Sequence, residues 1–122
     1  MGGGITLRQT VDNADVLAAA AMWYGKVRYS TGTNNNGPIT SIALAYADNV
    51  EVPLLGSFGG RDTSILPADV LALDGRLKTP HDLKVYDEAG HAFFDDTRPS
   101  YVASAASDGW ARTLAWFARY VG

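Results

Sequence analysis

Residues 52–62 read VPLLGSFGGRD, and this stretch decides the fold of the chain. Its first part, Val52 to Phe58, is apolar enough to predict a buried strand. Pro53 stands near the start of that strand, where a missing backbone N–H is tolerated. The two glycines that follow predict a tight turn, which leaves Asp62 just beyond the carboxyl end of the strand.

A helix and another strand are predicted on the carboxyl side of this stretch. The helix spans Pro67 to Leu77, because proline is favoured at the first helical position and apolar residues recur behind it at helical spacing. Residues 82–86, DLKVY, alternate between polar and apolar in the manner of a strand. The turn after this strand contains His91, so Asp62 and His91 each follow the end of a strand.

The chain is predicted to end in an amphipathic helix. Ser100 is a typical N-cap residue for it. Behind Ser100, apolar residues recur at helical spacing, and this stripe is expected to pack into the core. Its members are Val102, Ala106, Trp110, Leu114, Phe117 and Val121.

The amino-terminal side is predicted as a helix, a strand, a loop and a second short helix. The first helix is expected over Ile5–Val11, where apolar residues lie four apart. The second part of the apolar run Val16–Tyr24 is expected to form a strand covered on both faces. Much of Lys26–Thr40 consists of Ser, Thr, Asn and Gly, which is typical of a surface loop. A short helix is expected over Ile39–Ala47.

Helices and strands therefore alternate along the chain. That order implies an α/β fold of three parallel strands, joined by right-handed crossovers, with helices on both faces of the sheet. No internal repeat or linker divides residues 1–122, so a single domain is expected. A sheet of this size has two open edges that must be paired or covered.

Composition excludes several functional classes. The formal net charge is -3, which gives no basic surface for nucleic acid. No apolar run approaches the ~20 residues that a membrane helix needs. The absence of cysteine removes disulfides and thiolate metal ligands, and is compatible with a cytoplasmic location. His81 and His91 are too far apart in sequence for a metal-binding motif, so neither a metal nor a cofactor is expected.

Asp62 and His91 are the residues with the clearest chemical role. Reactive groups in open α/β sheets gather at the carboxyl ends of the strands, and neighbouring strands would bring these two side chains together. A carboxylate that accepts a hydrogen bond from an imidazole fixes its tautomer and stabilises the imidazolium. The alternatives are a histidine that only packs in the core or on the surface, and an aspartate that only forms a turn.

Four short motifs carry a resemblance to a known family. They are Phe58-Gly59-Gly60-Arg61-Asp62, Ala89-Gly90-His91-Ala92-Phe93, Arg98-Pro99-Ser100-Tyr101, and Tyr101-Val102-Ala103-Ser104-Ala105-Ala106 running into Arg112-Thr113-Leu114. Together they resemble the dienelactone hydrolase family of α/β-hydrolases, in which the chain order is nucleophile, Asp, His. The resemblance covers nearly all of the chain and implies the back half of that fold. It also implies that Asp62 and His91 are the last two members of a catalytic triad.

The resemblance implies further site residues. Met1-Gly2-Gly3 looks like the end of the family's Gly-x-Cys-x-Gly-Gly nucleophile elbow, so the nucleophile would stand just before Met1. The backbone nitrogen of Met1 would then fall where the family has an oxyanion donor. Tyr24 matches a pocket tyrosine. Arg98 is a candidate for binding a substrate carboxylate, although Asp95 stands nearer the place of the family's carboxylate-binding arginine.

Two functions follow as expectations. The first is part of an ester or lactone hydrolase, in which His91 is the general base and Asp62 orients it, inactive alone because the chain lacks a nucleophile. The second is a non-catalytic, self-associating domain. In that case two copies would pair the exposed edge strand near Met22–Tyr24 and form a homodimer.

Overall fold

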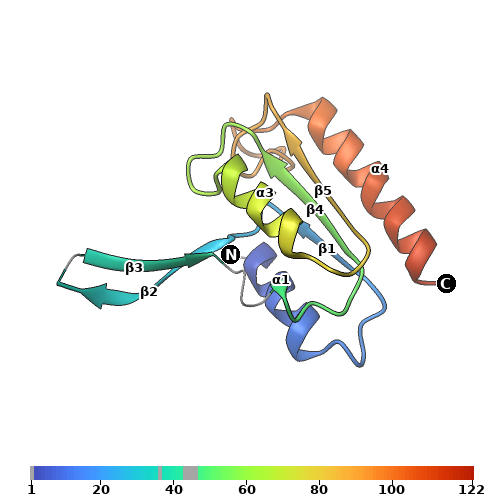
Figure 1. Cartoon of the computed structure of the whole chain (residues 1–122). Helices are drawn as coiled ribbons and strands as arrows, with labels where there is room; N and C mark the ends of the chain where they lie inside the picture. Colours follow the sequence, from blue (N-terminus) through green and yellow to red (C-terminus); the bar gives the residue numbers. More distant parts are fainter. Residues whose placement is uncertain (1, 36, 43–46) are drawn as a thin grey trace.

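The computed structural model describes residues 2–35, 37–42 and 47–122 of the chain. At its centre lies a sheet of three parallel strands, β1 (Ala20–Trp23), β4 (Leu54–Gly59) and β5 (His81–Tyr86), in the order β1-β4-β5. Figure 1 shows the three strands running side by side. The predicted α/β fold with a three-stranded parallel sheet is confirmed.

The central strand β4 is buried along its whole length. Its residues alternate between the two faces of the sheet, and the apolar ones fill both sides, as expected for a parallel strand between helices. Gly56 has no side chain, and this leaves room for Phe58 and Leu83, which a Cβ at position 56 would meet at 2.6 Å. Both neighbouring strands pair in register with β4, so all three strands end at the same edge of the sheet.

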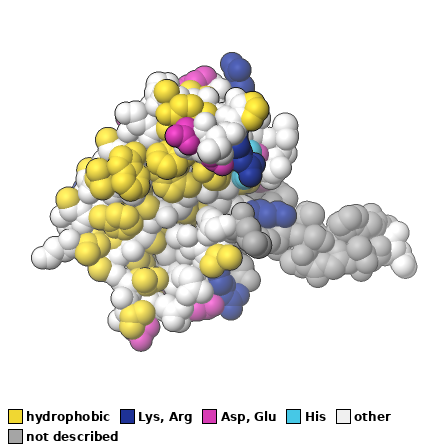
Figure 2. Space-filling view, turned by 180° about the vertical axis from the view of Figure 1, so that it is seen from behind, with side chains coloured by type: hydrophobic (Ala, Val, Ile, Leu, Met, Phe, Trp, Pro, Cys, Tyr) yellow, Lys and Arg dark blue, Asp and Glu magenta, His cyan; other side chains and the backbone are white. Residues whose placement is uncertain are grey.

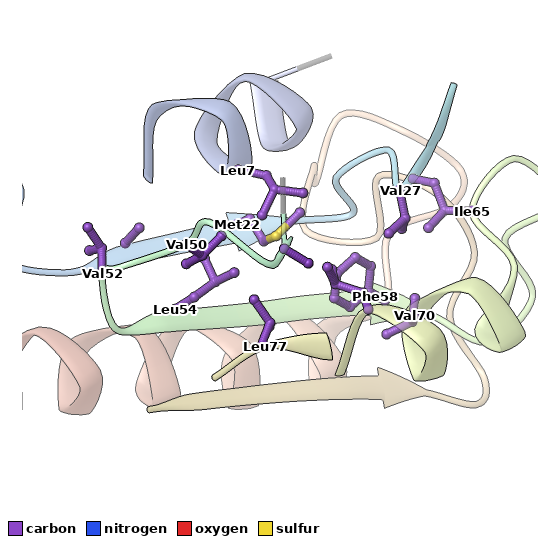
Figure 3. Packing of buried hydrophobic residues seen from close by; sticks show 13 residues of the cluster. Leu7, Met22, Val27, Val50, Val52, Leu54, Phe58, Ile65, Val70 and Leu77 are labelled. Atoms are coloured by element: carbon purple, nitrogen blue, oxygen red, sulfur yellow. The ribbon is translucent and has the colours of Figure 1, made fainter. Parts of the chain in front are cut away.

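Two helices cover one face of the sheet. These are α1 (Gly2–Asp12) and α3 (Pro67–Arg76), which confirm the helices predicted there. Leu7 from α1 and Leu73 from α3 are almost completely buried against apolar residues of β1 and β4. Figure 3 shows this core between the strands and the helices. Burial of apolar surface here is the main term that stabilises the fold.

The long helix α4 (Ala103–Tyr120) covers the other face. A second cluster packs there, with Tyr86, Phe93 and Ala105 buried and Trp23 beside them. Gly109 lets the helix approach the sheet closely, because a Cβ at that position would lie 2.6 Å from the Trp23 ring. The chain thus places helices on both faces of the sheet.

The stretch that was predicted to be a surface loop contains a β-hairpin instead. The antiparallel strands β2 (Arg28–Asn34) and β3 (Gly37–Ile42) form it, and Figure 1 shows it projecting from the body. Alternating Thr residues and Ile39 favour strands, and Asn and Gly between them suit a hairpin turn. The prediction gave too much weight to the turn-forming residues.

The helix predicted over Ile39–Ala47 is wrong for residues 39–42, whereas Ala47 at its end is helical. Residues 39–42 belong to β3 and pair with β2. Residues 43–46 lie outside the described part of the chain. The chain therefore has five strands in two sheets among its described residues, rather than three.

Two further predictions, both about the last helix, differ from the structure. Ser100 is not its N-cap: the helix begins at Ala103, with Val102 before it and no side-chain cap. The reason is a turn that is tied back to the preceding loop, because the Val102 N–H donates to the Phe93 carbonyl at 3.0 Å.

Only part of the predicted apolar stripe packs into the core: Ala106 is buried and Val102 packs against a core cluster, but the larger residues do not. Trp110, Leu114, Phe117 and Val121 are between 36% and 54% exposed. The buried face shares Ala106 with the predicted stripe but otherwise lies one residue over, and its members are mostly small: Ala105, Ala106, Gly109, Thr113 and Trp116. Small residues face the sheet because they allow close packing, so the larger apolar residues point outward.

Among the described residues, no helix is long and apolar enough to cross a membrane.

Candidate active site

Asp62 and His91 meet at the edge of the sheet where the strands end. Asp62 follows β4 and His91 follows β5, and these strands are direct neighbours. His91 Nδ1 lies 2.7 Å from Asp62 Oδ2. The aspartate side chain is only 1% exposed, whereas that of the histidine is 46% exposed. A buried carboxylate therefore holds one nitrogen of an imidazole that faces solvent.

The two loops that carry these residues are fastened to each other by backbone hydrogen bonds. The Gly60 N–H donates to the Tyr86 carbonyl at 2.8 Å, and the Arg61 N–H donates to the Ala89 carbonyl at 2.9 Å. Gly59 makes this approach possible, since a Cβ there would lie 2.5 Å from the Gly90 carbonyl oxygen. The sequence Gly-Gly before Asp62 is thus needed for close contact between the loops.

Asp62 also organises its own loop. Its Oδ1 accepts hydrogen bonds from the backbone N–H groups of Ser64 at 2.8 Å and Ile65 at 3.0 Å. Both bonds tie the carboxylate to the backbone of its own loop and fix its orientation. The remaining oxygen, Oδ2, faces His91 Nδ1, and this pairing leaves the other ring nitrogen, Nε2, to exchange protons with a reacting group.

Tyr24, the predicted pocket tyrosine, lies beside His91. Its ring centroid is 5.2 Å from that of His91 and 5.5 Å from that of Phe93. Its backbone has φ 37°, in the left-handed region that non-glycine residues rarely adopt, and its N–H donates to the Ser57 carbonyl at 2.6 Å. Burial raises the pKa of the Tyr24 phenol, and the charge of Asp95 raises this pKa further, so the hydroxyl stays protonated at neutral pH.

A cavity of about 310 Å³ opens next to His91. Its walls come from β1 and its continuation, from the first turn of α1, and from the histidine loop. The lining residues are Gly2, Gly3, Thr6, Ala21, Trp23, Tyr24 and His91. The sequence identified Tyr24 and His91, but it did not identify Trp23 and Thr6 as cavity residues. The position of Trp23 at the carboxyl end of a strand was the signal available for it.

The other predicted site residues lie elsewhere. Arg98 is not among the described residues that line this cavity. Its Nε lies 3.1 Å from Asp95 Oδ2 in an exposed turn. The positive charge of Arg98 opposes part of the rise in the pKa of Tyr24. Hydrogen bonds from Thr97 lower the pKa of Asp95. Met1 falls outside the described residues.

Substitution of Gly59 tests whether the loop contact positions the pair. Gly59→Ala should force the two loops apart, because the new Cβ would meet two backbone carbonyls, those of Ala89 and Gly90. We expect a loss of about 1–3 kcal/mol in the free energy of unfolding, as for other overpacked sites. Urea unfolding followed by circular dichroism measures the stability, and the NMR signal of the His91 Nδ1 proton reports on the pair.

Gly75→Ala is the matched control. It lies in α3, and a Cβ there would meet nothing within 4 Å. Because alanine favours the helix over glycine, this variant should be unchanged or up to about 1 kcal/mol more stable. Equal stability of the two variants would contradict the role given to Gly59.

Among residues 2–35, 37–42 and 47–122, no group of three or more His, Cys, Asp or Glu side chains is arranged to hold a metal ion.

Comparison with protein families gives a match along almost the whole chain. The model of the dienelactone hydrolase family matches residues 1–121. A protein of Escherichia coli K12 described as "putative carboxymethylenebutenolidase" is 40% identical over 125 residues, which are 99% of this chain and 44% of that protein. A protein of Salmonella typhimurium with the same description is 40% identical over 124 residues, again 44% of its length. The chain thus spans less than half the length of these curated relatives.

Matches to solved structures also cover nearly all of this chain and about half of the other chain. The crystal structure of a "putative dienelactone hydrolase" from Klebsiella pneumoniae has a TM-score of 0.80 and 37% identity, and the match covers 97% of this chain and 48% of that one. An esterase of Pyrococcus furiosus, Pf2001, has a TM-score of 0.72 at 17% identity, covering 98% of this chain and 51% of the other. At that identity the likeness concerns the fold alone.

Proposed function

The chain belongs to the dienelactone hydrolase family, and from this premise we propose that it supplies the acid–base half of an ester or lactone hydrolase. In this proposal His91 is the general base, Asp62 orients it, and the nucleophile comes from a segment that this sequence does not contain. The observation that carries the proposal is the 2.7 Å contact between His91 Nδ1 and the buried Asp62 Oδ2, beside a cavity.

Cysteine, serine and threonine side chains of this chain are the first candidates for the nucleophile. The sequence has no cysteine. Ser57 lies inside β4, is 1% exposed, and its Oγ is 3.4 Å from Arg112 rather than beside His91. Thr6 lines the cavity, but its hydroxyl donates to the Gly2 carbonyl at 3.0 Å within its own helix. Neither of these hydroxyls is placed to react with His91, so in this proposal the nucleophile that meets His91 Nε2 comes from another segment.

The proposed reaction uses both nitrogens of His91. The incoming nucleophile gives its proton to Nε2 as it attacks the carbonyl carbon of the ester, and a tetrahedral intermediate forms. Asp62 stabilises the imidazolium through Nδ1–H. As the intermediate collapses, the carbon–oxygen bond breaks and Nε2–H protonates the leaving alkoxide. Water then attacks the acylated nucleophile, again with His91 as base, and releases the acid.

A hybrid protein tests this function. The hybrid joins this chain to the part of the Klebsiella relative that it does not match, so that the relative supplies the remainder of the fold. We expect the hybrid to hydrolyse 4-nitrophenyl acetate, and the chain alone to hydrolyse it no faster than buffer. Initial rates at equal protein concentration give the comparison.

Two results would contradict the proposal. Turnover by the chain alone, at a rate well above buffer, would mean that it contains its own nucleophile. A hybrid that unfolds cooperatively but lacks any turnover would mean that Asp62 and His91 do not form a competent pair.

A further inference from the structure

Polar side chains join α4 to the sheet. Hydrophobic side chains cover much of the face of the molecule that Figure 2 shows, but the contact between α4 and the strands β4 and β5 also contains a polar group. Its members are Ser57, Asp82, Lys84, Tyr86, Asp108 and Arg112. Tyr86 is 6% exposed and ends β5, so it stands immediately before the loop that carries His91. A buried hydroxyl needs hydrogen-bond partners, and these partners fix where the side chain lies.

The hydroxyl of Tyr86 reaches α4. It donates to Asp108 Oδ2 at 2.7 Å and accepts from Arg112 Nη1 at 3.5 Å. Burial raises the pKa of the Tyr86 phenol, and the bond to Asp108 raises this pKa further, whereas hydrogen bonds from Lys84 and Tyr86 lower the pKa of Asp108. At neutral pH the phenol therefore keeps its proton and donates it to a charged carboxylate, which makes a strong hydrogen bond.

The backbone of Tyr86 holds both loops of the Asp62–His91 pair. Its carbonyl oxygen accepts from the Gly60 N–H at 2.8 Å, in the loop of Asp62, and from the Ala89 N–H at 3.1 Å, in the loop of His91. One carbonyl thus fastens the two loops at a single point. A displacement of Tyr86 would move both loops, whose relative position sets the distance of 2.7 Å between His91 Nδ1 and Asp62 Oδ2.

The ring of Tyr86 reaches the histidine by a second route. Its centroid is 5.3 Å from that of Phe93, and the Phe93 centroid is 5.5 Å from that of Tyr24. Tyr24 in turn packs on His91 with their centroids 5.2 Å apart. Phe93 is 0% exposed, so a change in the orientation of the Tyr86 ring is transmitted through close packing.

We propose that Tyr86 is a positioning residue for the Asp62–His91 pair, and that its hydrogen bond to Asp108 fixes this position from α4. The inference rests on the proposed function, because it assigns a further residue to the same site. Tyr86 is not among the described residues that line the cavity beside His91. It therefore acts through the two loops rather than on a bound ester.

Tyr86→Phe tests the proposal, because it removes the hydroxyl and keeps the ring. We expect the Nδ1 proton of His91 to exchange with water roughly fivefold faster in the variant chain, which is the effect of one ordinary hydrogen bond on an opening equilibrium. Saturation-transfer NMR measures this exchange without a substrate. In the hybrid protein, kcat for 4-nitrophenyl acetate should fall roughly tenfold while KM stays within about twofold, because His91 is displaced and the cavity is kept.

Asp108→Ala removes the other half of the same hydrogen bond. The Asp108 side chain is 47% exposed on α4, so the fold should survive. We expect the same two effects as for Tyr86→Phe, and no further loss when both substitutions are combined, because the two residues act through one bond. Asp108→Asn keeps an oxygen that can accept from the hydroxyl, and it should restore most of the kcat.

Asp82→Asn is the matched control. It weakens a different contact between β5 and α4, the ion pair of Asp82 Oδ2 with Arg112 Nη2 at 3.0 Å, at the amino end of the strand. Arg112 keeps its hydrogen bond to the Asp82 carbonyl at 3.3 Å. Proton exchange at His91 and kcat should both stay within about twofold of the parent, as for other surface changes.

Three results would overturn the positioning proposal. They are an unchanged exchange rate in Tyr86→Phe, losses that multiply in the double variant, and a loss in Asp82→Asn as large as that in Tyr86→Phe. If Tyr86→Phe fails to fold, Asp108→Ala decides by the same two measurements. Faster proton exchange in the variant chain, together with a parent hybrid that shows no ester turnover, would support the positioning and contradict the hydrolase function, so the two proposals fail separately.

Discussion

His91→Ala is expected to lower kcat/KM for ester hydrolysis by the hybrid protein by about 10³-fold or more, as when the base of a triad is removed. Alanine cannot take the proton of the nucleophile or return it to the leaving group. The fold should survive, because the His91 side chain is 46% exposed and lies in a loop. Initial rates with 4-nitrophenyl acetate measure the loss.

The chain provides a matched control for this result. His81→Ala removes the only other histidine, whose Nδ1 lies 2.7 Å from the Thr79 carbonyl and which is not among the cavity residues. Its kcat/KM should stay within about twofold of the parent hybrid, because surface changes away from a site have small effects. Equal loss in both variants would mean that the effect comes from stability rather than from catalysis.

Asp62→Asn tests whether the carboxylate orients His91, while the hydrogen bonds that hold its own loop are kept. An asparagine oxygen can still accept from the backbone N–H groups of Ser64 and Ile65. Its amide would donate to His91 Nδ1, which puts the ring proton on Nε2 and removes the base. We expect a loss of activity similar to that of His91→Ala with little loss of stability. Full activity of Asp62→Asn would contradict the assigned role of the carboxylate.

The largest effect on stability is expected for Leu73→Ala. Leu73 is 0% exposed in α3 and packs in the main core cluster with residues of α1 and β4. Its truncation removes buried apolar surface and leaves a cavity, which costs about 2–5 kcal/mol. A small domain has only about 5–15 kcal/mol of stability in total, so this is a large fraction of it. Urea unfolding followed by circular dichroism gives the value.

Leu71→Ala is the control, two residues away in the same helix. Leu71 is 73% exposed, so its truncation leaves no cavity in the core. It should change the free energy of unfolding by no more than about 0.5 kcal/mol. A similar loss in both variants would contradict the assignment of the effect to core packing, because alanine does not weaken the helix.

Most of the central sheet could be predicted from the sequence. The short apolar run of β4, bounded by turn residues, and the alternation in β5 are both typical of strands. From the ends of these two strands alone it followed that Asp62 and His91 would meet. The motifs around them also identified the family, and the family match over residues 1–121 confirms it.

The hairpin β2–β3 could not be predicted in the same way. Its strands and turn are rich in Ser, Thr, Asn and Gly, so composition favoured a loop. Strands of this kind are specified by pairing with each other, which is a non-local property.

What the sequence by itself determined is the three-stranded parallel sheet with the helices α1, α3 and α4, and the place of Asp62 and His91 after successive strands. The tertiary structure decided which side of α4 is buried, and it assembled the cavity from α1, β1 and the histidine loop. The physical reason is that α4 has two neighbouring apolar stripes. Periodicity identifies both stripes, but close packing against Trp23 selects the one with Gly109 and leaves the larger residues exposed.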